Sequence, residues 1–300
     1  MRVPATAPSL EDEVAPATAA FYRHALQLLT AANVPFLVGG AFAHACFTGI
    51  RRSTKDLDLF IRREDFDRIA ALAQAEGWHA EVTYPHWLGK VYAGEEFIDL
   101  IFNSGNGLTP VDDRWFRDNT EALVLGVPVR LANIEDSLLS KAFIMERERY
   151  DGADIAHLLH ANAQHLDWAG LLERFGANWR VLLSHLTLFG FIYPDERQHI
   201  PRWVMETLIA RLASETRCPP AQDLRVCAGT LLSREQYLHD VEQLGYVDGR
   251  LTAASTMTPQ DVATWTEAIP ARQEAQAAEA PKVLAPVAEP LPDCAALLKP

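Results

Sequence analysis

The sequence is poor in cysteine, with only Cys46, Cys218, Cys227 and Cys294 among its 300 residues. These cysteines lack the close paired spacing of a zinc site and are too sparse for a disulfide scaffold. There is also no apolar run of about 18 residues, the length that a transmembrane helix requires. The N-terminus has no apolar core behind a basic region, so no secretory signal is expected. These absences predict a protein of the reducing cytoplasm without a membrane span.

Basic residues are outnumbered, because 27 Lys and Arg stand against 40 Asp and Glu and give a formal net charge of −13. Sequence-independent binding to a nucleic-acid backbone needs clustered Lys and Arg. The charge balance therefore argues against broad contact with RNA or DNA. It remains compatible with a local basic groove and with a cationic small molecule as a ligand.

The composition that is present, 49% hydrophobic and 22% charged, is ordinary for a globular protein. The length favours two packed units plus tails. Residues 1–16 are rich in Pro, Ala and acids, which predicts disorder. We expect an α/β unit with a mixed sheet over residues 17–131 and a helical unit over 132–250. A low-complexity tail rich in Ala, Pro and Glu, expected to be disordered, follows over 251–300.

One stretch combines an apolar run, a double glycine and two alternating acids. The run Phe36–Val38 predicts a strand, Gly39-Gly40 breaks it, and a helix of small residues follows. The alternation around Asp56 and Asp58 predicts a second strand over Asp56–Arg62. Because residues two apart in a strand point to the same face, both carboxylates are expected to project together.

A third acid, Asp99, stands alone in the β-prone run Phe97–Phe102. A lone carboxylate inside an apolar strand is costly unless it has a partner. Neighbouring carboxylates repel each other when ionised, and Mg²⁺ is the hard cation that such oxygen ligands suit. Two metal ions about 3.5–4 Å apart can clamp both oxygens of a phosphoryl displacement. Backbone N–H groups at a helix start, as after Gly39-Gly40, form an anion site.

Taken alone, the Asp-x-Asp pattern is equally compatible with an exposed strand. Combined with the double glycine and Asp99, it favours a metal–phosphate site. These elements resemble the nucleotidyltransferase superfamily related to DNA polymerase β, through Val38-Gly39-Gly40, the helix carrying His44, Arg51-Arg52-x-Thr54-x-Asp56-x-Asp58 and Asp99. They are most similar to the small prokaryotic branch that contains abortive-infection toxins of type IV toxin–antitoxin systems and antibiotic nucleotidyltransferases.

The resemblance covers about residues 30–160 and implies a mixed sheet flanked by helices. It implies transfer of a nucleoside monophosphate from an NTP, with release of pyrophosphate. Asp56, Asp58 and Asp99 would hold two Mg²⁺ ions, and Asp99 would help to deprotonate the acceptor hydroxyl. The groups expected to meet the triphosphate are the backbone at Gly39 and Gly40 and the side chain of Arg52 or Thr54, or both. His44 lies among Ala, Phe and Cys, so core packing is favoured over a direct role.

A second segment, Ser140-Lys141 followed by Arg149-Tyr150-Asp151-x-x-Asp154, resembles the Lys…Arg-x-Lys-Asp-x-x-Asp pattern of the toxin-like branch. In that branch the lysine-bearing helix faces the nucleotide, so the resemblance implies that Lys141 contacts phosphate or base. Asp151 and Asp154 are expected to be structural or to face the acceptor. The chain departs from the branch at Tyr150, where lysine is usual. This departure argues against toxin-like substrate use.

Three acceptor classes stay open: a small metabolite or drug, a tRNA end and a protein side chain. The acidic composition favours the small molecule. The residues do not specify whether ATP or another NTP is the donor. An alternative from another class is a nucleotide-binding or protein-interaction module of the same fold that transfers nothing and acts with a partner protein, as in toxin–antitoxin pairs.

Overall fold

The structure is a computed structural model and describes residues 14–218 and 224–269. The chain divides into a compact unit, Met1–Thr266, and a second unit, Glu267–Pro300. Everything below concerns the first unit. Most of the predicted disordered N-terminus and of the predicted tail, residues 1–13 and 270–300, lies outside the described residues. The boundary proposed between 131 and 132 remains a prediction.

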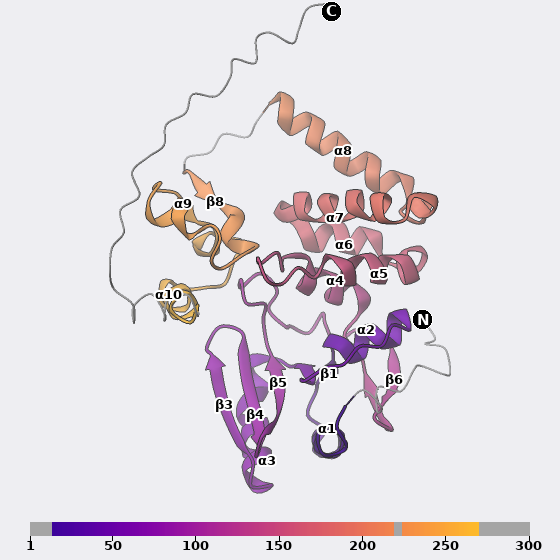
Figure 1. The fold of residues 1–300 in the computed structure, drawn as a ribbon, viewed down its shortest axis with the longest axis vertical. Helices are drawn as coiled ribbons and strands as arrows, with labels where there is room; N and C mark the ends of the chain where they lie inside the picture. The colour runs from indigo at the N-terminus through magenta and orange to yellow at the C-terminus, as the bar shows by residue number, and fades with distance from the viewer. Residues whose placement is uncertain (1–13, 219–223, 270–300) are drawn as a thin grey trace, which may run out of the picture. The chain divides into compact units, whose positions relative to one another are not determined.

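The first half of the chain forms the expected mixed sheet, in the order β1-β2-β5-β4-β3 (Figure 1). Strands β2 and β5 run parallel, and the other neighbours are antiparallel. The strands are β1 (Leu37–Val38), β2 (Asp58–Phe60), β3 (His79–Tyr84), β4 (Leu88–Ala93) and β5 (Glu96–Ile101). The α/β fold class predicted from the sequence is thereby confirmed.

Buried and partly exposed side chains alternate along β5, so one face of the sheet packs on the core and the other does not. Ile98 and Leu100 are buried, whereas Asp99 between them is only half-buried. Leu57 and Leu59 are fully buried in the same way and leave Asp58 on the other side. The polar face of the sheet therefore carries the two acids that flank these core residues.

Three helices and a hairpin complete this half: α1 (Pro16–Ala31), α2 (Gly40–Thr48), α3 (Phe66–Ala75), β6 (Glu121–Val124) and β7 (Val127–Arg130). Helix α1 begins with Pro16 at its first position, where a missing N–H costs nothing. Its buried stripe includes Phe21, Leu26 and Leu29, which join the main core. Helix α2 ends at Gly49, whose φ of 75° is the usual left-handed helix terminus.

The expected helical segment follows and stacks in successive layers (Figure 1). It consists of α4 (Ile134–Ala142), α5 (Gly152–Asn162), α6 (Trp168–Phe175), α7 (Trp179–Ile192) and α8 (Arg202–Arg217). Helix α5 packs against α2, α4 and α7, so one core continues from the sheet half into the helices. Helix α4 stops before Met145, because Met145 bridges Tyr150 in a tight turn.

After residue 223 the chain is mostly short turns, although the helical unit was expected to continue to residue 250. Of residues 224–250, only α9 (Leu238–Glu242) is α-helical, between the parallel strands β8 (Val226–Cys227) and β9 (Val247–Asp248). Helix α10 (Pro259–Glu267) lies in the segment predicted as tail. The connecting 3-10 helices are η2 (Arg63–Asp65), η3 (Ala163–His165), η4 (Gly176–Asn178), η5 (Pro194–His199), η6 (Ala228–Leu231) and η7 (Gly249–Leu251).

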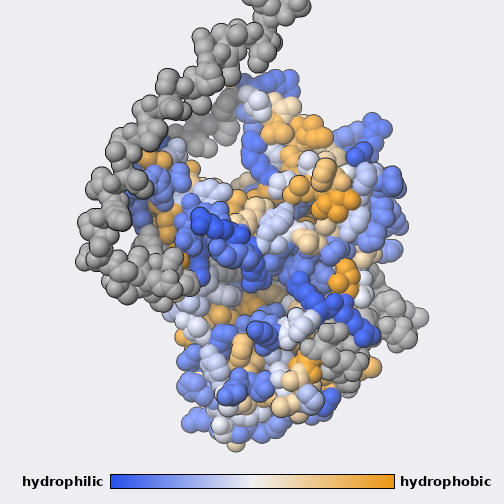
Figure 2. Space-filling model, viewed as in Figure 1, coloured by the Kyte–Doolittle hydropathy of each residue, from blue (hydrophilic) through white to orange (hydrophobic). Residues whose placement is uncertain are grey.

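Figure 2 shows apolar side chains on the surface over α7 and α8, within a mainly hydrophilic face. The exposed large apolar residues of these helices are Leu188, Phe191, Ile192, Trp203 and Ile209. Among the helices of residues 14–218 and 224–269, none is long and apolar enough to cross a membrane.

Candidate functional site

Three carboxylates converge on the polar face of the sheet. Asp58 begins β2 and pairs in register with Asp99 of the parallel strand β5. One oxygen from each, together with one from Asp56, lies within 4.8 Å of the others. The structure therefore brings together the three acids singled out in the sequence, which we call the acid triad.

The carboxylate of Asp56 is oriented toward the acid triad by a side-chain hydrogen bond rather than by the strand that the sequence predicted. Strand β2 begins only at Asp58, so Asp56 precedes the strand and does not owe its direction to strand alternation. The Thr54 hydroxyl donates to Asp56 Oδ1 at 2.8 Å and accounts for the orientation of that carboxylate. Thr54, expected at a phosphate, is placed behind Asp56 instead.

The double glycine touches the acid triad directly. The Gly39 N–H donates to the Asp58 carbonyl at 2.9 Å. Gly40 has a φ of 54°, and a Cβ there would lie 1.7 Å from Asp58 Oδ2, so no side chain fits. A Cβ on Gly39 would lie 2.2 Å from the Phe60 ring. Two glycines are thus needed for the start of α2 to approach the acid triad.

Lys90 is a site residue that the sequence analysis missed. Strand β4 pairs Lys90 with Asp99, and Lys90 Nζ lies 2.5 Å from Asp99 Oδ1. The sequence holds a signal for this pairing, because Gly94 turns β4 directly into β5 and so brings these two positions opposite each other. This lysine is the partner that a lone strand carboxylate requires.

The acid triad is electrostatically unfavourable without a cation. Burial, together with the charges of Asp56 and Asp99, raises the pKa of Asp58 to about 7, although Lys141 and Arg149 oppose the shift. Burial also raises the pKa of Asp99, although Lys90 opposes the shift. Within the described part of the chain, no hydrogen bond reaches the Asp58 carboxylate. Burial raises the pKa of the Tyr22 hydroxyl, and the charges of Asp56, Glu96, Asp99 and Asp58 add to the shift.

The two predicted cations, Arg52 and Lys141, meet at Asp154 of α5. Arg52 forms a fork with 2.7 and 2.8 Å bonds to the two oxygens of Asp154, and Lys141 Nζ lies 2.7 Å from Oδ2. Burial alone would raise the pKa of Asp154, but Lys141 and Arg52 outweigh it and lower the pKa to about 2. Lys141 also lies 3.2 Å from Asp151, and its charge partly opposes the rise in the pKa of Asp58.

Arg149 is a second site residue that sequence reasoning undervalued. Its guanidinium donates to both oxygens of Asp151 at 3.1 Å. The hydrogen bond to Asp151 raises the pKa of Arg149, and the charges of Asp58 and Asp56 add to that shift. Arg149 therefore joins Asp151 and Lys141 in one ion-pair cluster whose charges interact with Asp58 of the acid triad.

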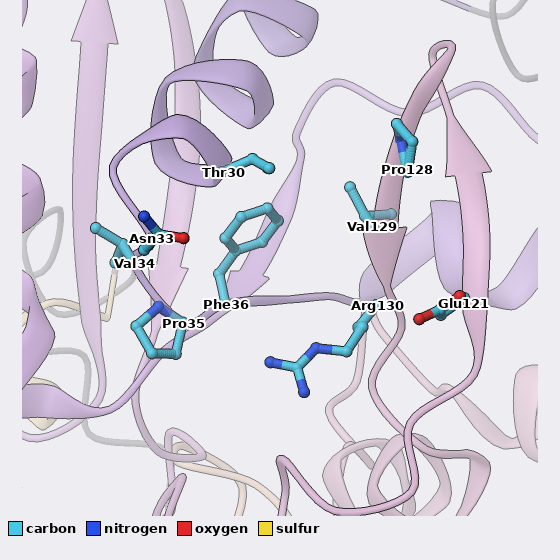
Figure 3. Close-up of a pocket in the computed structure, with 9 residues that line it drawn as sticks. All are labelled: Thr30, Asn33, Val34, Pro35, Phe36, Glu121, Pro128, Val129 and Arg130. Atoms are coloured by element: carbon cyan, nitrogen blue, oxygen red, sulfur yellow. The ribbon is translucent and has the colours of Figure 1, made fainter.

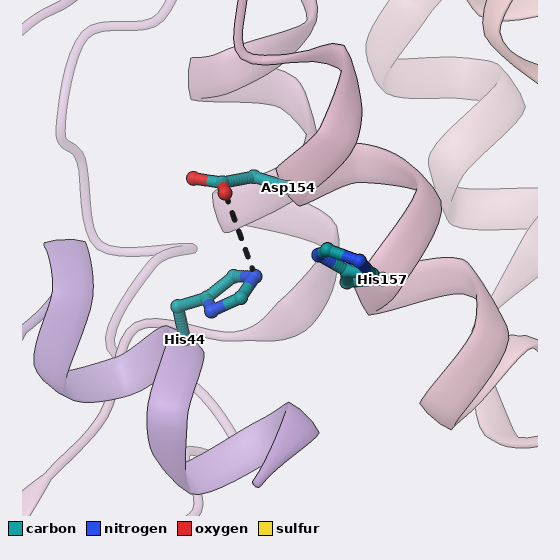
Figure 4. Close-up of side chains that lie close together, drawn as sticks. All are labelled: His44, Asp154 and His157. Carbon is teal, nitrogen blue, oxygen red and sulfur yellow. Dashed lines mark ion pairs between the residues drawn. The ribbon is translucent and has the colours of Figure 1, made fainter. Parts of the chain in front are cut away.

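A second group of possible ligands, His44, Asp154 and His157, lies between α2 and α5 (Figure 4). His44 is buried, its Nε2 lies 3.8 Å from Asp154 Oδ1, and no described residue forms a hydrogen bond with that nitrogen. Burial lowers the pKa of His44 to about 4 despite Asp154, so the ring is neutral near pH 7. Since Arg52 and Lys141 already balance Asp154, a further cation there is disfavoured.

A surface cleft of about 440 Å³ lies elsewhere, between the end of α1, the start of β1 and the β6–β7 hairpin (Figure 3). Phe36, Pro35 and Val129 give it apolar walls, and Glu121 and Arg130 supply its charges. Among the described residues that line the cleft, none belongs to the acid triad. This cleft is therefore separate from the acid triad.

Comparison with known proteins gives one family and several remote structural similarities. A family model described as "Uncharacterised nucleotidyltransferase" matches residues 22–185. The lincomycin-bound lincosamide antibiotic adenylyltransferase LnuA is 17% identical over 50% of this chain and 99% of that one, with a TM-score of 0.37. A nucleotidyltransferase-like antigenic protein from Paracoccidioides brasiliensis is 16% identical over 61% and 91%, with a TM-score of 0.41. No curated protein sequence matches the chain.

Proposed function

Because the chain belongs to the family of uncharacterised nucleotidyltransferases, we propose that it moves a nucleoside monophosphate from an NTP to an acceptor hydroxyl and releases pyrophosphate. The observation that supports this most is the convergence of Asp56, Asp58 and Asp99 within 4.8 Å, directly against Gly40. Membership of the family agrees with the resemblance seen in the sequence. The roles of the individual residues below are part of the proposal.

The acid triad fits a pair of Mg²⁺ ions. It offers hard carboxylate oxygens, and the pKa values of Asp58 and Asp99 are raised by burial and by the neighbouring carboxylates, which a bound cation would offset. Bound Mg²⁺ would neutralise the charge of these carboxylates and the negative charge that develops on the phosphate oxygens. Asp56, Asp58 and Asp99 would hold the ions, with Thr54 fixing the direction of Asp56.

Asp99 also serves as the base. The acceptor O–H bond breaks and its proton moves to Asp99, while the acceptor oxygen forms a bond to the α-phosphorus. The bond from the α-phosphorus to the oxygen that bridges it to the β-phosphorus breaks, and pyrophosphate leaves with that electron pair. Lys90, 2.5 Å from Asp99 Oδ1, keeps the carboxylate in place. The raised pKa of Asp99 increases its affinity for the proton.

The triphosphate would lie against the start of α2. The small backbone at Gly39 and Gly40 permits close approach, and Arg149, whose charge interacts with those of Asp56 and Asp58, would contribute a cation. Lys141 and Arg52 act from Asp154, where they add positive potential to the site. A direct phosphate contact by either would require it to exchange its Asp154 partner for the ligand.

We favour a small molecule with a hydroxyl group as the acceptor over a tRNA end or a protein side chain. The net charge of −13 disfavours a polyanion. The acids that face the site favour an acceptor that is neutral or positively charged. ATP is the first donor to test, followed by the other three NTPs.

Transfer of label tests the proposal. Each α-³²P-labelled NTP is incubated with Mg²⁺ and a panel of hydroxyl-bearing metabolites and antibiotics, with tRNA and protein as further arms. Wild type should label an acceptor, and Asp58→Ala should lose at least about a hundredfold. The control is Asp195→Asn, because Asp195 is exposed on η5, away from the acid triad. Equal labelling by Asp58→Ala would contradict the proposal, as would metal-independent binding without turnover, which the silent-module alternative expects.

A further inference from the structure

A tight hairpin between α4 and α5 carries Arg149, which is ion-paired with Asp151 beside Lys141. Met145 and Tyr150 form an isolated antiparallel bridge, and the Glu146 N–H donates to the Arg149 carbonyl at 2.8 Å. The Asp151 N–H closes the turn on the Ile144 carbonyl at 3.2 Å. We call residues 144–151 the Arg149 hairpin. Its own hydrogen bonds fix its shape but not its attachment to the rest of the molecule.

The attachment comes from Glu146 and residues far along the chain. Glu146 Oε1 accepts the backbone N–H of Arg234 at 3.0 Å, and Oε2 accepts the hydroxyl of Ser233. The Met145 N–H donates to the Leu232 carbonyl at 3.1 Å. Ser233 is only 2% exposed, so its bond to a carboxylate is sheltered from competing water.

Residues 224–266, which we call the C-terminal segment, also hold the loop that follows β5. The Thr256 N–H donates to the Gly107 carbonyl at 2.9 Å, and Asn103 Nδ2 donates to the Thr256 hydroxyl at 2.8 Å. Asn106 Nδ2 donates to the Leu231 carbonyl at 2.8 Å. One segment is therefore bonded both to the loop that continues the strand of Asp99 and to the Arg149 hairpin.

Aromatic packing strengthens the same attachment. Trp265 of α10 meets the Trp87 ring edge-on, with 5.3 Å between ring centroids, at the beginning of β4. The Arg234 guanidinium lies 4.5 Å from the centre of the Trp265 ring. Arg234 therefore binds Glu146 through its backbone and contacts Trp265 through its side chain. Trp265 in turn packs on Trp87 of the sheet half.

We propose that Glu146 is a positioning residue of the nucleotide site, which fixes the Arg149 hairpin to the C-terminal segment so that Arg149 faces the triphosphate. The C-terminal segment then belongs to the donor site although its side chains need not touch the nucleotide. This inference rests on the proposed function, because it assigns Arg149 to the triphosphate.

The first test measures binding of magnesium tripolyphosphate by calorimetry, a probe that needs neither base nor acceptor. Glu146→Ala and Arg149→Ala should each raise the Kd about tenfold, and the double variant should bind no more weakly than Arg149→Ala. Glu146→Gln retains an oxygen for the Arg234 N–H and should bind nearly as wild type does. Glu148→Ala is the matched control, since Glu148 is exposed on the same hairpin. Additive losses in the double variant would overturn the inference.

The second test is hydrogen exchange without any ligand. Glu146→Ala should speed exchange of amides in residues 144–151 at least about fivefold, whereas Glu148→Ala should not. Unchanged protection in Glu146→Ala would overturn the inference independently of binding. If wild type does not bind tripolyphosphate, the proposed function fails, and exchange still decides whether Glu146 holds the hairpin.

Discussion

Asp58 is the residue at which the fold and the proposed chemistry conflict most directly. Its folded-state pKa of about 7 exceeds the ordinary value of 3.8. The folded state therefore binds the proton more tightly than the unfolded state, and stability falls as pH rises from about 4 to about 7. Such a site tolerates its charge at neutral pH by drawing in a cation.

The first prediction concerns this pH dependence. Asp58→Asn should be more stable than wild type without Mg²⁺, by an amount that grows between pH 4 and pH 8 to at most about 4 kcal/mol. Urea unfolding at both pH values measures the difference, and Asp195→Asn serves as the control. Added Mg²⁺ should stabilise wild type and reduce the gap. A difference independent of pH would show that Asp58 carries no shifted pKa.

A second prediction separates the two demands on Gly40, its backbone angle and its lack of a side chain. Gly40→Ala should lose activity at least about a hundredfold, because its Cβ displaces the Asp58 carboxylate. Gly49→Ala is the matched control: Gly49 also has positive φ, of 75°, yet a Cβ there meets no described atom within 4 Å. It should cost about 1 kcal/mol of stability and leave kcat/KM intact. Equal kinetic losses would rule out the steric explanation.

At the scale of elements, α5 connects the sheet half to the helical half through one carboxylate. Asp154 binds Arg52, which precedes β2, and Lys141, which ends α4. Lys141 is buried, so its charge depends on Asp154 and on Asp151, 3.2 Å away. Breaking a buried ion pair on one side leaves an uncompensated charge.

The third prediction follows from this ion-pair cluster. Asp154→Asn should destabilise the protein by about 3 kcal/mol near pH 7. Because the folded-state pKa of Asp154 is lowered to about 2, this contribution is present above pH 4 and is lost as the pH falls toward 2. Urea unfolding at pH 7 against pH 3 measures it. Asp67→Asn, on the exposed side of α3, should change stability little; the same loss in both variants would refute the cluster's role.

Features of the elements that arise from neighbouring residues could be predicted from the sequence, whereas features that arise from tertiary contacts could not. Alternation predicted that Asp58 leaves the core between Leu57 and Leu59, since that pattern acts within a few residues, whereas the meeting of Asp58 with Asp99 was implied by the family resemblance. The pairing of Arg52 with Asp154 was not predictable, because 102 residues separate them and only tertiary packing brings them together. The pairing of Lys90 with Asp99 follows from the register of the β4–β5 hairpin, which depends on the geometry of the turn as well as on the two strand sequences.

The region after residue 223 shows a second limit. The helical unit was expected to extend through this region to residue 250, yet Ser233 caps turns by accepting the N–H groups of Glu235 and Gln236. The hydroxyl also donates to Glu146, a contact that no local pattern encodes. Side chain–backbone hydrogen bonds and a distant carboxylate thus override the helical pattern there.

At the scale of the whole molecule, charge limits the choice of acceptor. A net charge of −13 opposes a polyanion at long range. The fourth prediction is that fluorescence anisotropy with a tRNA acceptor-stem hairpin will show no binding at 0.1 M salt and micromolar protein. Binding that weakens steeply between 50 and 200 mM salt would instead reveal a phosphate-reading surface and favour the tRNA class.

The most direct measurement of the central claim is a crystal structure with Mg²⁺ and a non-hydrolysable NTP analogue. The account predicts ions bound to carboxylate oxygens of Asp56, Asp58 and Asp99, at about 2.0–2.1 Å. The α-phosphate should lie beside them, and the triphosphate should lie between Gly39-Gly40 and Arg149. A nucleotide in the cleft lined by Phe36 and Arg130, with no ion at the acid triad, would contradict it.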